Sequence, residues 1–323
     1  MHSHSSPETA CTAQLGSPSA VPLTAELWLL TGASGLLGRA LAAELRSAGL
    51  RLRVLEHRRA CASLGDELVR ATLEDERALA RALDGVRGVV HAAAVLEGTP
   101  AELEAGNARG TERLASAAAR AGAARFVFVS TAAVYAPGSF RDADEAQALG
   151  PEEPYGASKL SAERAAEKAL GERLAIARLP SLIGNGRSRF LEQLAGAVLH
   201  HRLPRLPDGG AAIELVHVND AAAGIRALAE AKRAAGAFHF AAPERLRYRE
   251  LMELVAAELG CLPRWTPIDG ADESAIEPVL LRFATQERTL SCARARELLG
   301  YRPRWDPVNA LRAAFASHRA SAG

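Results

Sequence analysis

The sequence predicts an α/β fold in which helices cover both faces of a parallel β-sheet. Two observations predict it. From Glu26 to Pro180, short apolar runs alternate with stretches whose apolar residues recur at helical spacing, a pattern typical of strand–helix–strand units with right-handed crossovers. A glycine-rich loop also joins the first apolar run to the first expected helix. With 323 residues, the chain is long enough for one large domain or for a domain with a smaller lobe.

The composition excludes several classes of protein. Hydrophobic residues make up 48% of the chain and the net charge is +1, so a substantial core can form and a nucleic-acid partner is not expected. No apolar run approaches the roughly 20 residues that cross a bilayer, so no membrane partner is expected. The cysteines form no closely spaced pair, which argues against disulfides and a metal site: they are Cys11, Cys61, Cys261 and Cys292. We expect a soluble, cytoplasmic protein.

The first 25 residues differ from the rest of the chain. They are rich in Ser, Pro and Thr and nearly uncharged. They lack the basic segment and apolar core of a secretory signal. We therefore expect residues 1–25 to form a disordered tail.

The elements of the α/β pattern follow in order. Each expected strand is a short apolar run of the kind that is buried on both faces: 26–32, 50–56, 88–94, 125–130 and 173–180. The expected helices are 36–48, 76–83, 107–121 and 155–170. The first helix stops at Gly49, because glycine is a common helix C-cap. A further strand is expected in LVHVND, residues 215–220.

The loop Thr31–Gly38 (TGASGLLG) carries the first chemical signal. In such a loop, one glycine permits a tight turn, one lets the backbone approach a pyrophosphate, and one allows close helix packing. Gly32, Gly35 and Gly38 stand at these positions between a strand and a helix. The helix N-terminus can then hold the anion. The loop predicts a dinucleotide-binding domain.

The domain boundaries follow from this assignment. Residues 26–180 form the dinucleotide-binding domain, and we expect 214–242 to return to it. Beyond Pro180 the alternation of strand and helix patterns becomes irregular, and glycine and proline residues indicate loops. Segments added to such a sheet usually cover the carboxyl ends of the strands, where ligands bind. We therefore expect residues 181–213 and 243–323 to form a smaller substrate-binding lobe.

The choice between NAD and NADP depends on the end of the second expected strand. Glu56 lies 24 residues after Gly32, near the offset at which a carboxylate binds the ribose hydroxyls of NAD. Arg58 and Arg59 follow it, and guanidinium groups suit the extra phosphate of NADP. The sequence favours NAD slightly and leaves NADP open.

Tyr155 and Lys159 form a second chemical signal. They are spaced i and i+4, so they are neighbours on one helix face. A lysine beside a phenol is expected to lower the pKa of the tyrosine towards the range of a general acid or base. Ser130 and Thr131 end a strand, where a hydroxyl can hydrogen-bond a substrate oxygen. Each residue alone has an ordinary structural explanation, but their combination behind a glycine loop predicts an active site.

The chain resembles the extended short-chain dehydrogenase/reductase family, whose NAD-dependent epimerases and dehydratases share these motifs. The resemblance runs from about Leu27 to Phe315. Its motifs occur in the family's order: TGASGLLG, VVHAAA, NARGTERL, FVFVSTAAVYA, PYGASKLSAE, RLPSLIGNG, LVHVND and ARELLGYRPRW. The resemblance implies a Rossmann-like, doubly wound parallel sheet with a smaller C-terminal substrate lobe.

The resemblance also implies roles for individual residues. Thr131 is the catalytic hydroxyl, Tyr155 the acid/base, Lys159 the residue that binds the nicotinamide ribose, and Asn107 a further catalytic position. The implied cofactor-binding residues are Gly32, Ser34, Gly35, Leu36, Gly38, Glu56, Arg58, Thr72, Leu73, His91, Ala92, Ala93, Tyr155, Lys159 and Pro180. A homodimer that packs through the helices beginning near Asn107 and Tyr155 is implied as well.

Three departures from the family's patterns bear on the reaction and its substrate. Ala132 and Ala133 stand where the dehydratases have an Asp-Glu pair, which argues against elimination of water. Ala71-Thr72-Leu73 replaces the usual Gly-Asp-Leu beside the adenine. Ile213 replaces the arginine with which epimerases bind a sugar-nucleotide diphosphate. Nearby arginines could substitute for it: Arg187, Arg189, Arg202 and Arg205.

The sequence therefore predicts an NAD(P)-dependent oxidoreductase. Hydride would pass between nicotinamide and a carbonyl or secondary alcohol of a small-molecule substrate. A sugar-nucleotide epimerase that uses the same residues is the alternative. A non-catalytic dinucleotide sensor is a third reading, against which the Thr131, Tyr155 and Lys159 set argues.

Overall fold

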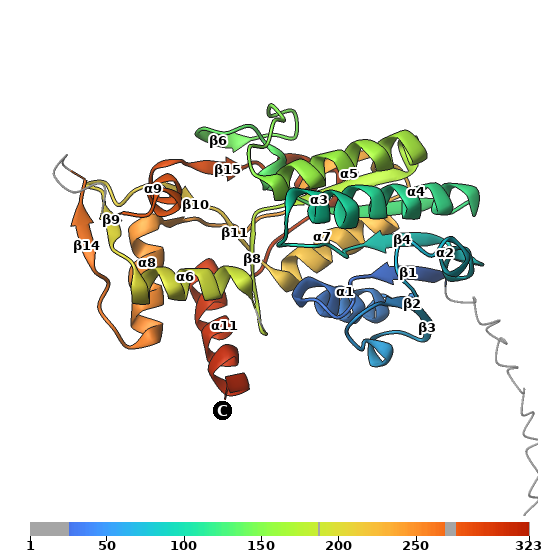
Figure 1. Cartoon of the computed structure of the whole chain (residues 1–323), viewed down its shortest axis with the longest axis horizontal. Helices are drawn as coiled ribbons and strands as arrows, with labels where there is room; N and C mark the ends of the chain where they lie inside the picture. Colours follow the sequence, from blue (N-terminus) through green and yellow to red (C-terminus); the bar gives the residue numbers. More distant parts are fainter. Residues whose placement is uncertain (1–25, 187, 269–275, 323) are drawn as a thin grey trace, which may run out of the picture.

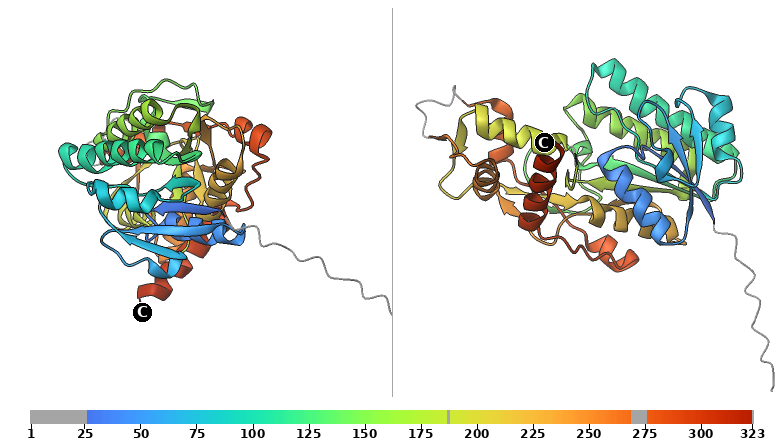
Figure 2. Two further views of the ribbon diagram at one scale, coloured as in Figure 1. Left: turned by 90° about the vertical axis from the view of Figure 1, so that its right-hand side faces the viewer. Right: turned by 90° about the horizontal axis from the view of Figure 1, so that it is seen from below.

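The computed structural model describes residues 26–186, 188–268 and 276–322. The expected tail, residues 1–25, and Arg187 lie outside the described residues. Figures 1 and 2 show two regions side by side, a sheet covered by helices and a smaller region at one of its edges. No helix of the described residues is long and apolar enough to span a membrane.

A seven-stranded parallel sheet forms the larger region, in the order β12-β7-β5-β4-β1-β2-β3. The strands are β1 (Leu27–Thr31), β2 (Arg51–Glu56), β3 (Glu67–Arg70), β4 (Gly88–His91), β5 (Arg125–Thr131), β7 (Leu174–Leu179) and β12 (Gly236–His239). The chain runs outward in one direction from β1 to β3 and in the other from β4 to β12. This reversal beside β1 is the point at which ligands bind in doubly wound folds. The predicted fold class is confirmed.

Alternation along the strands explains why helices cover both faces of the sheet. Trp28 and Leu30 of β1 belong to the hydrophobic core on one face, and Leu29 to the core on the other. The first core packs against α1 (Leu36–Ser47) and α7 (Val218–Glu230). The second packs against α2 (Glu76–Leu83), α4 (Gly110–Arg120) and α5 (Pro154–Leu170). Successive side chains of a strand point to opposite faces, so strands apolar throughout bury both.

A separate hydrophobic core organises the smaller region, which we refer to as the lobe. It is built around α6 (Arg189–His200), α8 (Tyr248–Leu259), α9 (Pro278–Thr285) and α11 (Pro307–Ala322). The short strands beside them are β8 (Ser181–Ile183), β9 (Leu203–Arg205), β10 (Ala212–Ile213), β11 (Leu215–His217), β13 (Leu246–Arg247) and β14 (Trp265–Pro267). Two further short strands, β6 (Phe140–Ala143) and β15 (Arg288–Leu290), pair with each other. The lobe lies beyond the carboxyl ends of the main strands (Figure 1).

Three elements differ from the expectations. The strand expected at 215–220 is only β11, which pairs with β8 and not with the main sheet. It ends because the His217 imidazole accepts a hydrogen bond from the Asn219 amide and caps α7. The helix expected at 107–121 begins earlier, with α3 (Pro100–Leu103), whose capping box includes Thr99. Finally, α10 (Ala293–Leu299) packs against the sheet region, although it follows the lobe in sequence.

Candidate active site

The glycine loop between β1 and α1 forms a close-fitting cradle. Gly32 has φ +74°, and a Cβ atom there would lie 2.5 Å from the Ala93 nitrogen. A Cβ on Gly38 would lie 2.0 Å from the Gly32 oxygen. Gly35 is the N-cap of α1 and, as a glycine, has no side chain that could cap the first amides of the helix. The N-terminus of α1 thus fits a pyrophosphate. Ser34 directly precedes the N-cap, and the partly buried Leu36 begins the helix.

His91 has a structural environment. Its ring nitrogens lie 2.6 Å from Thr31 Oγ1 and 3.0 Å from Thr111 Oγ1, so it links β1, β4 and α4. Its side chain is 1% exposed. Burial lowers the pKa of His91 to about 3, so the imidazole is neutral. The ring is enclosed in the core, so the backbone of Ala92 and Ala93, beside Gly32, supplies this wall of the cradle.

Glu56 is already held by other parts of the protein. Its carboxylate accepts hydrogen bonds of 2.8 Å from the Cys61 amide and from Arg70 Nε. The Arg70 guanidinium is the main reason that the pKa of Glu56 lies below its usual value. These contacts fix the carboxylate at the end of β2, while Arg58 is exposed. Thr72 is exposed and accepts a hydrogen bond from the Glu74 amide.

Two further predicted cofactor residues are partly buried. Leu73 lies against α4, because a Cβ on Gly110 would lie 3.0 Å from its Cδ1 atom. Pro180 follows β7 at the carboxyl edge of the sheet. Both positions therefore border the same edge as the glycine loop.

Asn107 lies in a π-helical turn, Glu104–Arg109, between α3 and α4. Its amide donates to the Val95 carbonyl and accepts from the Val95 amide, both at 2.8 Å. It also donates to Ser158 Oγ at 3.0 Å, and Ser158 Oγ donates to the Tyr155 carbonyl at 2.8 Å. Single π-helical turns occur frequently at functional sites. Asn107 therefore connects the loop after β4 to the first turn of α5.

Lys159 points into the protein, one turn after Tyr155. Its ammonium donates to the Val129 carbonyl at 2.7 Å and lies 4.0 Å above the Phe128 ring. Burial lowers the pKa of Lys159 to about 7, and Glu163, a turn further along α5, opposes this effect. Glu163 is itself bound to Arg178 by two hydrogen bonds of 2.7 and 3.1 Å.

Tyr155 differs from the expectation. Burial raises its pKa to about 12, and the charge that opposes this rise is that of Arg189, not Lys159. The physical reason is the direction of the lysine side chain, which bonds to Val129 on β5. In this structure the phenol is therefore protonated at neutral pH, which suits a proton donor.

Two hydroxyls end β5 beside this helix. Thr131 is partly buried, and its Oγ1 accepts a hydrogen bond from the Ala133 amide at 3.2 Å. Ser130 is 4% exposed, and its Oγ has no hydrogen-bond partner among the described residues. Buried polar atoms normally find a partner, so the Ser130 hydroxyl is a group that the sequence pattern did not distinguish from Thr131.

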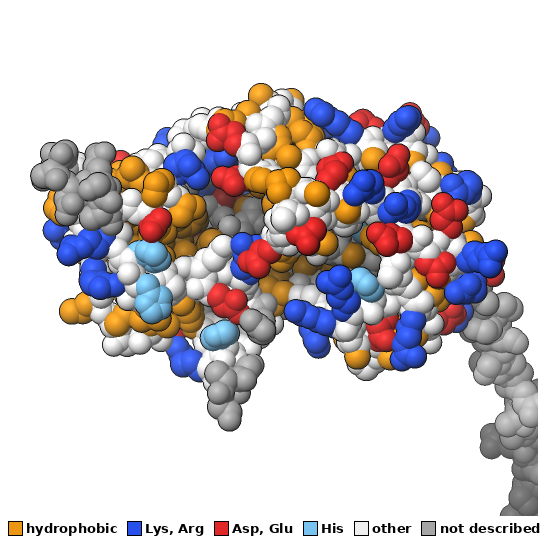
Figure 3. All heavy atoms as spheres, in the orientation of Figure 1, with side chains coloured by type: hydrophobic (Ala, Val, Ile, Leu, Met, Phe, Trp, Pro, Cys, Tyr) orange, Lys and Arg blue, Asp and Glu red, His pale blue; other side chains and the backbone are white. Residues whose placement is uncertain are grey.

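The lobe closes the other side of the site. Figure 3 shows a hollow between the sheet region and the lobe, with charged and hydrophobic side chains along its rim. Arg189, in the first turn of α6, donates to the Leu96 carbonyl at 2.9 Å and pairs with Glu97 at 2.8 Å. Arg205 lies on β9 at the far end of the lobe (Figures 1 and 2), and Arg202 directly precedes β9. Ile213 is 5% exposed in the lobe core, so its side chain offers nothing to a diphosphate.

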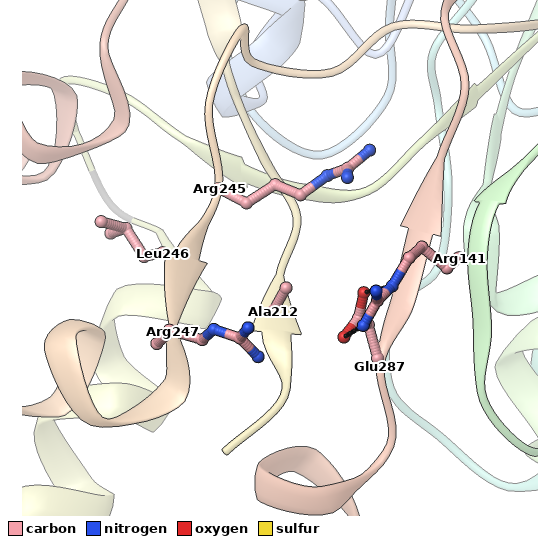
Figure 4. A pocket seen from close by; sticks show the side chains of 6 residues that line it. All are labelled: Arg141, Ala212, Arg245, Leu246, Arg247 and Glu287. Atoms are coloured by element: carbon pink, nitrogen blue, oxygen red, sulfur yellow. Dashed lines mark hydrogen bonds and ion pairs between the residues drawn. The ribbon is translucent and has the colours of Figure 1, made fainter. Parts of the chain in front are cut away.

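A cavity of about 240 Å³ lies among the short strands of the lobe. Figure 4 shows three arginines in its lining, Arg141, Arg245 and Arg247. Arg141 makes two hydrogen bonds to Glu287, and Arg245 is bound by Glu214 and Asp142. Carboxylates thus neutralise two of the guanidiniums, and none of the predicted catalytic residues lines this cavity.

The comparison with protein families decides the relationship. The model of the NAD dependent epimerase/dehydratase family matches residues 28–240. The chain belongs to this family. The resemblance seen in the motifs is confirmed. The family's name includes NAD dependence, which agrees with the dinucleotide site that the glycine loop predicts.

Individual members of the family differ in their reactions. The chain is 31% identical to a "3-diazoavenalumate denitrifying reductase" of Streptomyces sp, over 85% of this chain and 95% of that protein. It is 35% identical to a farnesyl-dihydroquinoline-oxide ketoreductase of Stigmatella aurantiaca, over 56% of this chain. The chain spans only 57% of that relative's length. A solved dTDP-glucose 4,6-dehydratase of Streptomyces venezuelae, with NAD bound, is 25% identical, with a TM-score of 0.74 over 91% of this chain and 97% of its own.

Proposed function

We propose that this family member is an NAD(P)-dependent oxidoreductase that interconverts a carbonyl and a secondary alcohol of a small molecule. The observation that carries the proposal is the joined set at the carboxyl edge of the sheet. Tyr155, Ser158 and Asn107 are linked by hydrogen bonds, and Lys159 is buried one turn away. The glycine cradle at the end of β1 supports a dinucleotide beside this set.

The residues of the chain would share the reaction as follows. NAD(P), when bound, supplies or accepts the hydride. Tyr155 donates the proton from its Oη atom to the carbonyl oxygen during reduction and takes it back during oxidation. Thr131 donates a hydrogen bond to the same oxygen. Lys159, fixed by the Val129 carbonyl, would bind the nicotinamide ribose.

The chain's own residues favour a reductase over the other reactions of the family. Ala132 and Ala133 follow Thr131, so the positions of the dehydratase acid–base pair have no ionisable group. Ile213 is buried in the lobe core, which argues against a diphosphate anchor. The relatives at 31% and 35% identity include proteins named as reductases. A sugar-nucleotide epimerase remains the second candidate because Arg189 places a cation at the site.

Turnover of carbonyl compounds tests the proposal. The full chain should oxidise NADH or NADPH in the presence of a ketone from a screened panel, followed by nicotinamide absorbance. Tyr155→Phe should lower kcat by about 100-fold or more, with the cofactor dissociation constant nearly unchanged. Tyr248→Phe is the matched control, because its hydroxyl is buried and has no hydrogen-bond partner among the described residues. Undiminished turnover by Tyr155→Phe would remove Tyr155 from the mechanism.

Calorimetry with UDP- and dTDP-sugars, in the presence of NAD, separates the two candidate functions. We expect no binding at micromolar concentration, because Ile213 cannot neutralise a diphosphate. Binding at that strength would favour the sugar-nucleotide epimerase over the reductase.

We also propose that the chain forms a homodimer through α4 and α5, as the family resemblance implies. These helices lie side by side on one face of the sheet (Figure 1). Both helices carry small, partly exposed side chains, including Ala119, Ser161 and Ala165. Light scattering at micromolar concentration should give twice the mass of one chain, 34.1 kDa. A monomer would contradict the proposal.

A further inference from the structure

The loop after β4 is fixed from two sides across the mouth of the site. On one side, Asn107 holds the amide and the carbonyl of Val95. On the other, Arg189 of α6 bonds to the Leu96 carbonyl and pairs with Glu97. The loop thus joins the sheet region to the lobe, and its polar link to the lobe is a guanidinium.

Hydrogen bonds link the loop that Arg189 binds to the helix that carries the reacting group. The same Asn107 amide that holds Val95 leads through Ser158 to the backbone of Tyr155. The positive charge of Arg189 reaches the Tyr155 phenol and opposes the rise of its pKa. A substrate whose oxygen meets that phenol therefore lies on the side of the site that is bordered by the loop to which Arg189 bonds.

The partner of Arg189 is easily replaced. The Glu97 side chain is 70% exposed and that of Arg189 is 42% exposed, and ion pairs between exposed side chains are weak. The contacts of the Arg189 guanidinium use its Nη1 atom, towards Leu96, and its Nε atom, towards Glu97. A guanidinium presents paired N–H donors that match both oxygens of a carboxylate.

We propose that Arg189 selects a substrate that carries a carboxylate near its reacting carbonyl, and that this carboxylate displaces Glu97. The inference rests on the proposed reductase function and names its substrate class. Glu97 acts as an internal substitute that keeps the guanidinium at the mouth of the site. A neutral carbonyl compound would have to leave that ion pair in place or break it without compensation.

Binding of matched acids and esters tests this inference without requiring turnover. The probes are phenylpyruvate and benzoylpropionate, each with its methyl ester, titrated by calorimetry into the full chain with oxidised NAD, so that no reduction occurs. We expect at least one acid to bind about tenfold more tightly than its ester. Arg189→Gln should abolish the difference by weakening the acid alone. Arg189→Lys should keep only part of it, because the charge remains without the fork.

Two further variants complete the design. Glu97→Gln should tighten binding of the acid, because it removes the competing carboxylate. Arg264→Gln, at an exposed arginine that donates to the Leu199 carbonyl, should change nothing. Equal affinities of acid and ester, no binding of either acid, or an equal loss for acid and ester in Arg189→Gln would overturn the inference.

The reductase proposal can fail or survive separately. Reduction of the esters by the unmodified chain, without preference for the acids, would uphold the reductase and overturn the role of Arg189. If the acids are reduced, Arg189→Gln should raise KM for the acid and leave KM for the ester unchanged.

Discussion

At the scale of single residues, the surroundings of a side chain determine its contacts and its protonation more than its spacing in the sequence does. Tyr155 and Lys159 are one helical turn apart, as the i, i+4 spacing requires, yet the lysine bonds to Val129 and the phenol keeps its proton. The spacing identifies which residues are neighbours on a helix. It contains no information about which of them bonds to a strand beneath. The same is true of Arg189, because the carbonyl to which it donates belongs to Leu96, 93 residues away along the chain.

Glu56 gives a prediction about cofactor choice. Its carboxylate is bonded to Arg70, and from the spacing of the glycine loop we expect a 2′-phosphate of NADP to meet this carboxylate. Glu56→Ala should shift the ratio of NAD to NADP affinity towards NADP by about tenfold or more, because it removes a repelling charge and frees Arg70. Fluorescence titration with NADH and NADPH measures the ratio.

The control for Glu56 lies on the neighbouring strand. Glu67 of β3 also pairs with arginines, Arg51 and Arg53. Glu67→Ala should leave the cofactor ratio unchanged. An unchanged ratio in Glu56→Ala as well would reduce Glu56 to a structural partner of Arg70.

At the scale of elements, the long, regular parts of the chain were predictable and the irregular joints were not. The helix expected at 76–83 coincides with α2, and the one at 155–170 differs from α5 by one residue. The π-helical turn at Glu104–Arg109 was not predicted, because one inserted residue leaves the apolar pattern almost unchanged. Strands of two or three residues, such as β10 and β11, are too short for any periodicity to define.

The π-helical turn leads to a prediction about Asn107. Asn107→Ala leaves the polar backbone groups of Val95 without their partner and frees the loop that carries Glu97. The free energy of unfolding should fall by about 1–3 kcal/mol, as for other buried groups that lose a hydrogen bond. Urea unfolding measures this loss, and kcat should fall with it.

Asn219 supplies the comparison for that change. It lies in the first turn of α7 with an exposed side chain. Asn219→Ala should alter the free energy of unfolding by less than about 0.5 kcal/mol. An equally small effect of Asn107→Ala would show that the loop does not depend on its amide.

At the scale of the whole molecule, buried histidines contribute to the loss of stability in acid. Burial lowers the pKa of His239 to about 4 and that of His91 to about 3. Between pH 6.5 and these values the unfolded chain binds protons that the folded chain does not. Each histidine therefore lowers the free energy of unfolding by about 1.4 kcal/mol for every unit that the pH falls through this range.

His239→Gln tests this dependence. The variant should show a smaller loss of unfolding free energy between pH 7 and pH 5 than the unmodified chain, measured by urea unfolding. His57→Gln, at an exposed position, should leave the dependence unchanged. The same slope in all three proteins would mean that His239 titrates alike in the folded and unfolded states.

The path of the chain between its two large parts has a practical consequence for engineering. It leaves the sheet region after β7, returns for α7 and β12, leaves again for α8 and α9, returns for α10 and ends in the lobe with α11. The carboxylate of Asp220 also fastens the backbone of Arg304 and Trp305. No single uninterrupted gene fragment therefore encodes either part. Chimaeras with a relative need at least five junctions, and a stop codon placed before α10 would damage both halves at once.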